Sequence, residues 1–156
     1  MIPYGKQDIS EDDIRAVVEV LRSDFITQGP VVVNFEKAVA QRSGADYAIA
    51  VNSATSALHI ALAALDVGAN DLVWTSPITF VASANCALYC GADVDFVDID
   101  PDTFNMCPVA LAAKLKEAES LGRLPKVIIP VHMAGQSTLT REISEIVKPY
   151  GIRIVE

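Results

Sequence analysis

The chain has 156 residues, of which 51% are hydrophobic, which is enough to bury one core of ordinary domain size. Its formal net charge of -8 argues against nucleic-acid binding, because contacts with a phosphate backbone need clustered Lys and Arg side chains. No apolar run reaches the roughly 18 to 20 residues of a membrane helix, and the first residues lack the regions of a signal peptide, so we expect a soluble cytoplasmic protein.

The first predicted helix begins near Ser10. Ser10 and Asp13 have the spacing of a capping box, and Ile14, Val17 and Leu21 then recur at helical spacing. We expect this apolar stripe to lie against a larger body.

A turn and a second predicted helix follow. The turn is expected at residues 28–30, where Gly29 and Pro30 are typical of a helix start. The helix is expected to carry Val32, Phe35 and Val39 inward before Gly44 ends it.

From residue 47 onward, short apolar runs alternate with segments of helical length. Strands that are apolar on both faces and separated by helices form parallel sheets, so the pattern predicts an α/β fold with a mainly parallel sheet in an α/β/α sandwich. In such sheets, ligands bind beyond the carboxyl ends of the strands. The expected strands are 47–51, 73–75, 94–99, 127–131 and 152–155, and the expected helices are 55–65, 81–89, 108–120 and 139–148.

Cysteine and aspartate residues could indicate a disulfide or a metal site. Cys86 and Cys90 lie four residues apart within an apolar helical pattern, so we expect buried thiols. Aspartates recur at alternating positions between Asp93 and Asp102. Because they flank and follow a strand, their side chains are more simply explained by solvent exposure or helix capping than by a metal, and we expect no metal site.

Residues 51–58 join the first predicted strand to a helix through small and hydroxyl side chains, including Thr55 and Ser56. Free N–H groups and hydroxyls at a helix start suit a phosphate group. Ordinary capping of the helix by Ser53 or Thr55 explains the same residues equally well. The segment is neither a Walker loop nor a GxGxxG fingerprint, which weighs against a nicotinamide-dependent enzyme.

Two further side chains follow predicted strands and should lie at the same edge of the sheet. The ring of Phe80 could cover the face of a flat cofactor, although an aromatic residue taken alone is more often part of the core. His132 places an imidazole nearby that could act in catalysis, although a lone histidine is usually a structural hydrogen-bonding group. His59, beside Leu58 and Leu62, is most simply a packing residue.

Several segments in order resemble the DegT/DnrJ/EryC1/StrS aminotransferase family, and the likeness runs over essentially the whole chain. Each segment alone is weak, but together they are specific. Residues 4–10, 27–30 and 130–136 resemble one branch of the family in particular. The segments that carry the resemblance are Phe25 to Pro30, Asn52 to Leu58, Ser76 to Ala82, Val97 to Asp100, Pro130 to Gly135 and Ile154 to Glu156.

The resemblance implies the fold of type I transferases that depend on pyridoxal 5'-phosphate (PLP). Residues 1–156 would be the N-terminal portion of the PLP-binding large domain. Thr55 and Ser56 would hold the cofactor phosphate, and Phe80 would stack on the pyridine ring. The residues expected on the substrate side are Thr27, Gln28, Gly29 and His132.

The same resemblance implies the activity and partners. The family moves an amino group from an amino acid, usually glutamate, to a nucleotide-linked keto-sugar, and it acts as a homodimer with shared active sites. Its catalytic lysine, and the aspartate that pairs with the pyridine nitrogen, would follow Glu156. We therefore expect a chain truncated before the lysine and the C-terminal small domain, inactive alone and without a catalytic residue of its own. A sugar dehydratase of the same superfamily and a non-catalytic Rossmann-like phosphate-binding module stay open as alternatives.

Overall fold

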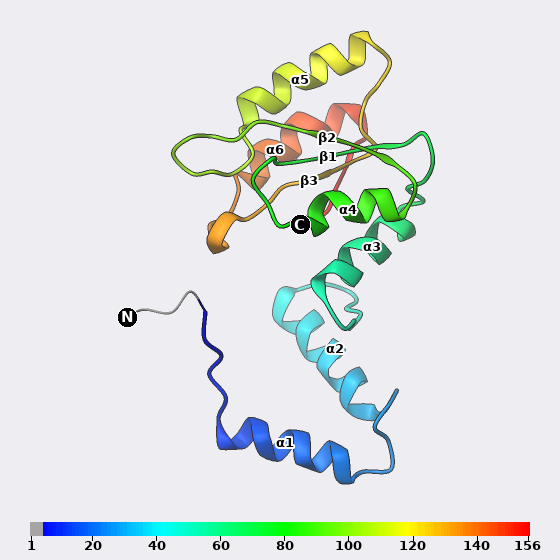
Figure 1. The fold of residues 1–156 in the computed structure, drawn as a ribbon, viewed down its shortest axis with the longest axis vertical. Coiled ribbons are helices and arrows are strands. Elements are labelled where there is room, and N and C mark those ends of the chain that lie inside the picture. Colours follow the sequence, from blue (N-terminus) through cyan, green and yellow to red (C-terminus); the bar gives the residue numbers. More distant parts are fainter. Residues whose placement is uncertain (1–4) are drawn as a thin grey trace. The chain divides into compact units, whose positions relative to one another are not determined.

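This computed structural model describes residues 5–156, so the first residue of the segment 4–10 lies outside the described part. The chain forms two compact units that divide between Ala50 and Val51 (Figure 1). The expected substrate-side residues Thr27 to Gly29 belong to the first unit, and the expected cofactor residues to the second. No helix within residues 5–156 is long and apolar enough to cross a membrane.

The first unit contains helices α1 (Glu11–Arg22) and α2 (Pro30–Ser43). The predicted capping box is present: Ser10 accepts the N–H of Asp13, and the Asp13 carboxylate accepts the N–H of Ser10 at 2.7 Å. Helix α2 begins with a proline and ends at Gly44, whose φ of 71° is the left-handed conformation that glycine adopts without strain. Both predicted helices are therefore confirmed, together with their start and stop signals.

The apolar stripes of these two helices are exposed, so the prediction that they point inward is wrong for the described chain. No residue of α1 or α2 is buried, and Val17 and Phe35 are each 59% exposed. The physical reason is size, because two helices alone cannot enclose the apolar stripe that each presents.

The second unit is built on a four-stranded parallel sheet, as predicted. Its strands are β1 (Leu72–Thr75), β2 (Asp93–Phe96), β3 (Val127–Ile129) and β4 (Arg153–Ile154), in the spatial order β2-β1-β3-β4. Its helices are α3 (Ala54–Ala64), α4 (Ala82–Tyr89), α5 (Pro108–Ser120) and α6 (Thr140–Val147), with short 3-10 turns η1 (Met133–Gly135) and η2 (Lys148–Tyr150).

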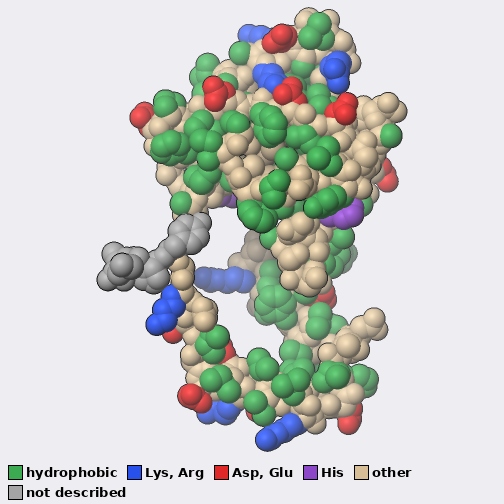
Figure 2. All heavy atoms as spheres, in the orientation of Figure 1, with side chains coloured by type: hydrophobic (Ala, Val, Ile, Leu, Met, Phe, Trp, Pro, Cys, Tyr) green, Lys and Arg blue, Asp and Glu red, His purple; other side chains and the backbone are tan. Residues whose placement is uncertain are grey.

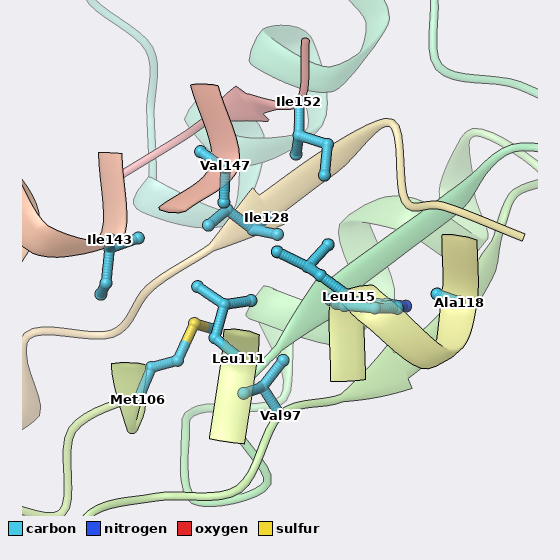
Figure 3. Packing of buried hydrophobic residues seen from close by; sticks show 10 residues of the cluster. Val97, Met106, Leu111, Leu115, Ala118, Ile128, Ile143, Val147 and Ile152 are labelled. Carbon is cyan, nitrogen blue, oxygen red and sulfur yellow. The ribbon is translucent and has the colours of Figure 1, made fainter. Parts of the chain in front are cut away.

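Apolar side chains fill both sides of this sheet. Alternate residues of the central strands point to opposite sides, Trp74 and Ile128 to one and Val73 and Val127 to the other. The helices cover the two sides in pairs, which confirms the α/β/α sandwich. The first cluster includes Leu111, Leu115 and Ile143 from α5 and α6 (Figure 3), and the second includes Leu62 and Cys86 from α3 and α4.

The strand predicted at residues 47–51 is absent from the sheet. Tyr47 is 87% exposed and Ile49 is 74% exposed, and no strand of the described chain pairs with this segment. The N–H of Ala50 donates instead to the carboxylate of Glu36 at 2.9 Å. An apolar run becomes a strand only where a second backbone completes its hydrogen bonds, and a sequence pattern reports only the apolar run.

Candidate functional site

The candidate site lies at the carboxyl edge of the parallel sheet. Strands β1 and β3 pair Thr75 with Ile129, and β4 runs beside β3, so the three strands end side by side. Phe80 follows β1, His132 follows β3 and Glu156 follows β4. The topology therefore brings together residues that lie far apart in the sequence.

The first turn of α3 points toward the same edge. The helix leads through the loop at residues 65–71 into the start of β1, so it runs opposite to the strands. The helix has 11 residues, whereas β1 has four and β3 has three, so the helix extends along the full length of these strands. Leu62 packs against the sheet, which fixes the helix on this face.

Capping at the start of α3 leaves donors free. The hydroxyl oxygen of Ser53 accepts the N–H of Ser56 at 3.2 Å, and the Ser56 hydroxyl donates to Asn52 at 2.7 Å. Capping by Ser53 is therefore confirmed. The N–H groups of Ala54 and Thr55 have no acceptor in the part of the chain described, so a cap and an anion site are compatible here.

Phe80 is not a core residue, so the reading of its ring as a packing group is wrong. It is 74% exposed, in the segment between the end of β1 and the start of α4 where no layer of the sandwich covers it. Ser76, which directly follows β1, shows the opposite situation. Its hydroxyl is buried and has no hydrogen-bond partner within residues 5–156. The edge thus combines an open aromatic ring with an unsatisfied polar group.

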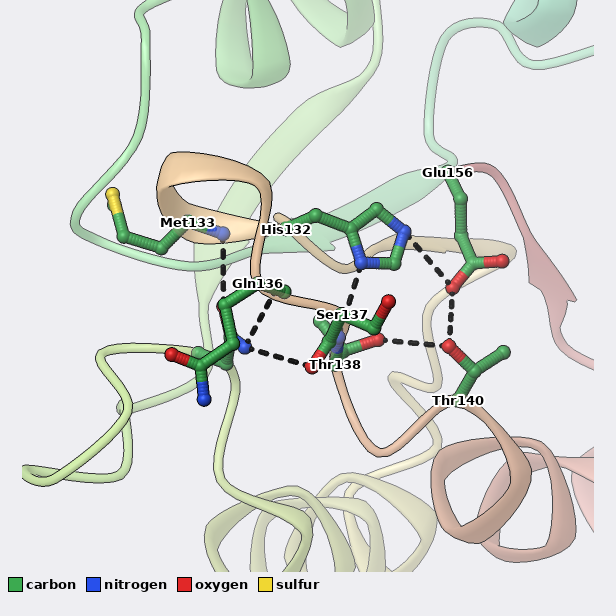
Figure 4. A network of polar contacts seen from close by, with 8 residues as sticks. His132, Met133, Gln136, Ser137, Thr138, Thr140 and Glu156 are labelled. Atoms are coloured by element: carbon green, nitrogen blue, oxygen red, sulfur yellow. Dashed lines mark hydrogen bonds and ion pairs between the residues drawn. The ribbon is translucent and has the colours of Figure 1, made fainter.

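His132 is held by a network of hydrogen bonds (Figure 4). Its Nδ1 accepts the backbone N–H of Thr138 at 3.0 Å, and its Nε2 lies 3.4 Å from Oε1 of Glu156. The hydroxyl of Thr140 donates to the same oxygen at 2.8 Å. The expected structural hydrogen-bonding role of His132 is confirmed.

Asn105 anchors the loop that contains this network. Its side-chain amide donates to the carbonyl oxygens of Gln136 at 3.1 Å and Ser137 at 3.2 Å, and its oxygen accepts the N–H of Met133 at 2.9 Å. It is 4% exposed, so these bonds satisfy a buried polar group. Asn105 was not predicted from the sequence, because a single asparagine in a loop has no spacing signal that links it to a distant segment.

The residues expected on the substrate side in the first unit form the turn before α2. Gln28 has a left-handed backbone with φ of 54°. Gly29 is buried, and a Cβ atom there would lie 2.8 Å from the Cβ of Phe25. Glycine at this position therefore has a structural reason that is independent of any ligand.

Asp93, Asp98 and Asp102 are exposed, as the simpler interpretation predicted, and two of the alternating aspartates also form ion pairs that the sequence did not indicate. Asp95 contacts Lys114 at 2.7 Å and Asp93 lies 3.7 Å from Arg123. Burial alone would raise the pKa of Asp95, but the hydrogen bonds from Lys114 and from the N–H of Phe96, together with the charges of Lys114 and Arg123, outweigh it and the pKa is lowered. Within residues 5–156, no group of three or more His, Cys, Asp or Glu side chains is placed to hold a metal ion.

The remaining candidate side chains have packing roles. The cysteines are free, and burial raises the pKa of the Cys86 thiol in the core. The ring of His59 lies 5.4 Å from that of Tyr89, tilted by 58°. The expectation of a buried thiol is confirmed for Cys86, whereas Cys90 is only partly buried, and the packing role of His59 is confirmed.

Comparison with known proteins identifies close relatives. Residues 7–156 match the DegT/DnrJ/EryC1/StrS aminotransferase family. The chain is 40% identical to the UDP-4-amino-4,6-dideoxy-N-acetyl-beta-L-altrosamine transaminase of Campylobacter jejuni, covering 100% of this chain and 40% of that protein. It is 39% identical to the spore coat polysaccharide biosynthesis protein SpsC of Bacillus subtilis, covering 99% of this chain and 38% of that protein.

A solved structure shows the same fold. A DegT DnrJ EryC1 StrS aminotransferase from Brucella abortus superposes with a TM-score of 0.85 at 33% identity, covering 90% of this chain and 38% of the other. The chain thus spans less than half the length of the relatives that it matches.

Proposed function

The chain belongs to the DegT/DnrJ/EryC1/StrS aminotransferase family, and we propose that it forms the front of the cofactor domain of a longer PLP-dependent sugar aminotransferase. That enzyme would move an amino group from an amino acid, with glutamate the expected donor, to a nucleotide-linked keto-sugar. The observation that carries this proposal is the first turn of α3, where N–H donors stay free. It lies at the carboxyl edge of the sheet, and Phe80 follows β1 at the same edge.

The residues at this edge fit PLP. Thr55 and Ser56 would bind the phosphate, because the N-terminus of a helix favours negative charge and the N–H of Thr55 is free. Phe80 would cover the pyridine ring, and its 74% exposure leaves the ring available for stacking. The unpartnered hydroxyl of Ser76 adds a polar group at the same edge. When bound, PLP supplies an electron sink for chemistry at the amino-bearing carbon.

The phosphate assignment is tested by removing the two hydroxyls while the Ser53 cap is kept. In the complete protein, Thr55→Ala with Ser56→Ala should weaken PLP binding about 10-fold or more, since hydrogen bonds to a charged group contribute about 1.5–3 kcal/mol. The measurement is an absorbance titration with PLP. Ser120→Ala is the matched control, because Ser120 ends α5 at the opposite edge of the sheet. An unchanged PLP affinity in the double variant would reject the assignment.

The remaining catalytic parts are expected beyond Glu156. We propose that the complete protein continues with an aspartate for the pyridine nitrogen and, further on, the catalytic lysine. Reading the coding sequence past this point tests it directly. A histidine in place of the lysine would indicate a sugar dehydratase, and a stop codon would indicate a phosphate-binding module.

The class of substrate is proposed from the relatives that the chain resembles within the family. The likeness to the Campylobacter jejuni transaminase supports a nucleotide-linked amino-sugar pathway, and SpsC supports a role in polysaccharide biosynthesis. Thr27, Gln28 and Gly29 stay predicted substrate contacts. His132 does too, although both of its ring nitrogens already have protein partners. Incubating the complete enzyme with glutamate and a panel of nucleotide-linked keto-sugars, followed by mass spectrometry of the products, would identify the acceptor.

A homodimer is proposed as the active form. It is supported by the family and by the exposed apolar side chains of α1 and α2. The cytoplasmic location expected from the sequence stays a prediction, which cell fractionation would test.

A further inference from the structure

Glu156 and His132 lie in a closed ring of polar contacts that joins the segments following two strands and consists of hydrogen bonds and one His–Glu contact. The backbone N–H of Thr138 donates to His132, and the hydroxyls of Thr138 and Thr140 lie 3.0 Å apart. Thr140 and His132 both contact Oε1 of Glu156, at 2.8 and 3.4 Å. The ring thus joins the loop after β3 to Glu156, which follows β4 (Figure 4).

The direction of these bonds defines the state of each group. An imidazole nitrogen that accepts a hydrogen bond carries no proton, so neutral His132 has its proton on Nε2, where it faces Glu156. The carboxylate accepts the hydroxyl of Thr140, and Nε2 of His132 lies 3.4 Å from the same oxygen. A charged acceptor strengthens such bonds, and the ring is partly sheltered because Thr138 is only 6% exposed.

The loop needs this support because its backbone is tightly turned. Ala134 and Gly135 have φ angles of 51° and 83°, and the N–H of Gly135 closes back on the carbonyl of His132 at 3.1 Å. Asn105 fixes the middle of the loop from one side. The contact between His132 and Glu156 fixes it from the side of β4.

We propose that His132 and Glu156 are positioning residues, whose contact holds the loop after β3 against the end of β4 and so shapes the carboxyl edge for cofactor binding. This inference rests on the proposed PLP site. Both ring nitrogens of His132 contact the protein, so its effect on cofactor binding is exerted through the loop. Such support is what keeps a binding site within the tolerance that its ligand needs.

The test uses two independent readouts on the complete protein. The first is hydrogen exchange of the Thr138 amide without cofactor, because this N–H bonds directly to His132. The second is the dissociation constant of PLP from an absorbance titration. His132→Phe keeps a ring of similar size and removes both nitrogens, so it should speed exchange at Thr138 about 10-fold or more and weaken PLP binding several-fold.

Two variants of Glu156 show whether its oxygen atom or its negative charge is needed to hold the loop. Glu156→Ala should weaken PLP binding as His132→Phe does, whereas Glu156→Gln should retain binding close to wild type. The amide oxygen can replace Oε1 as the acceptor for Thr140 and as the atom facing His132, because Oε2 makes no hydrogen bond or ion pair in the described residues. Glu145→Ala is the matched control, because the one ion-pair partner of Glu145 within residues 5–156 is Arg141, at 3.2 Å on the exposed face of α6.

The outcomes of these measurements test the positioning role of His132 and Glu156 separately from the proposed PLP-dependent function. Faster exchange and weaker PLP binding in His132→Phe and Glu156→Ala, with rescue by Glu156→Gln, support it. Unchanged exchange at Thr138, or faster exchange with unchanged PLP affinity, overturns the positioning role and leaves the proposed function standing. A wild-type protein that fails to bind PLP overturns the proposed function itself.

Discussion

Phe80 shows how a single side chain can separate stability from binding. It is 74% exposed, so Phe80→Ala should change the free energy of unfolding by no more than about 0.5 kcal/mol. Loss of stacking should nevertheless weaken PLP binding several-fold, since a stacked ring contributes about 0.5–1.5 kcal/mol beyond its buried area. Denaturant unfolding and an absorbance titration with PLP measure the two effects. A loss of several kcal/mol in stability would show that the ring packs in the core after all.

At this scale, the sequence predicted which residues gather at the edge but not how each is surrounded. Thr55, Phe80 and His132 could be selected because each follows a strand or begins a helix. The exposure of Phe80 and the contact of His132 with Glu156 depend on chain segments far away in sequence. Residue type and local spacing carry no information on such partners.

At the scale of elements, α5 holds its side of the sandwich through a buried leucine. Leu115 is 0% exposed between α5 and the sheet, whereas Leu121, at the end of the same helix, is 67% exposed. Leu115→Ala should lower the free energy of unfolding by about 2–5 kcal/mol, because it removes apolar contacts and leaves a cavity. The same substitution at Leu121 should cost less than about 1 kcal/mol. Equal losses of unfolding free energy in the two variants, measured by urea denaturation, would contradict the conclusion that Leu115 holds α5 against the sheet.

Helices were predicted better than strands, and the reason is physical. Caps and 3.6-residue periodicity are local, so the sequence placed α5 at its observed bounds and gave the correct ends of α2 at Pro30 and Gly44. A strand depends on a neighbour, so residues 47–51 were predicted as a strand although no described strand pairs with them. Burial of an apolar stripe also depends on a neighbouring element. The stripes of α1 and α2 were therefore expected to be buried, although they are exposed in the described chain.

For the molecule as a whole, stability should fall in acid because carboxylates of the folded chain hold their charge. The pKa of Asp71 is lowered by the hydrogen bond from Lys126, at 2.9 Å, and by the N–H of Gly68. A carboxyl whose pKa is lower in the folded state stabilises the fold above its ordinary value of 3.8, and this contribution is lost as the pH falls through the lowered pKa.

The pair of Asp71 and Lys126 allows this to be measured. Lys126→Met should lower the free energy of unfolding by up to about 1 kcal/mol near pH 7, a small value because both side chains are partly exposed. The difference from wild type should shrink at about pH 2, where the carboxylate is protonated in both states, to what the hydrogen bond from Lys126 to the carbonyl oxygen of Asp66 contributes. Lys116→Met, on the exposed face of α5, is the control. A difference that persists undiminished in acid would assign the effect to the hydrogen bond with Asp66 and packing of the lysine stem, and not to the charge of Asp71.

The exposed apolar side chains of the first unit predict that the complete protein associates with a second copy, and its assembly state tests this. Val17 and Phe35 are each 59% exposed, and apolar surfaces of this kind mark sites of association. The complete protein should therefore have the mass of two copies in light scattering. Val17→Glu should shift it toward one copy without lowering its melting temperature, whereas Glu19→Gln, on the exposed side of α1, should leave the dimer intact. If Val17→Glu unfolds the protein instead, residues of the same complete chain cover this face, and the second copy does not.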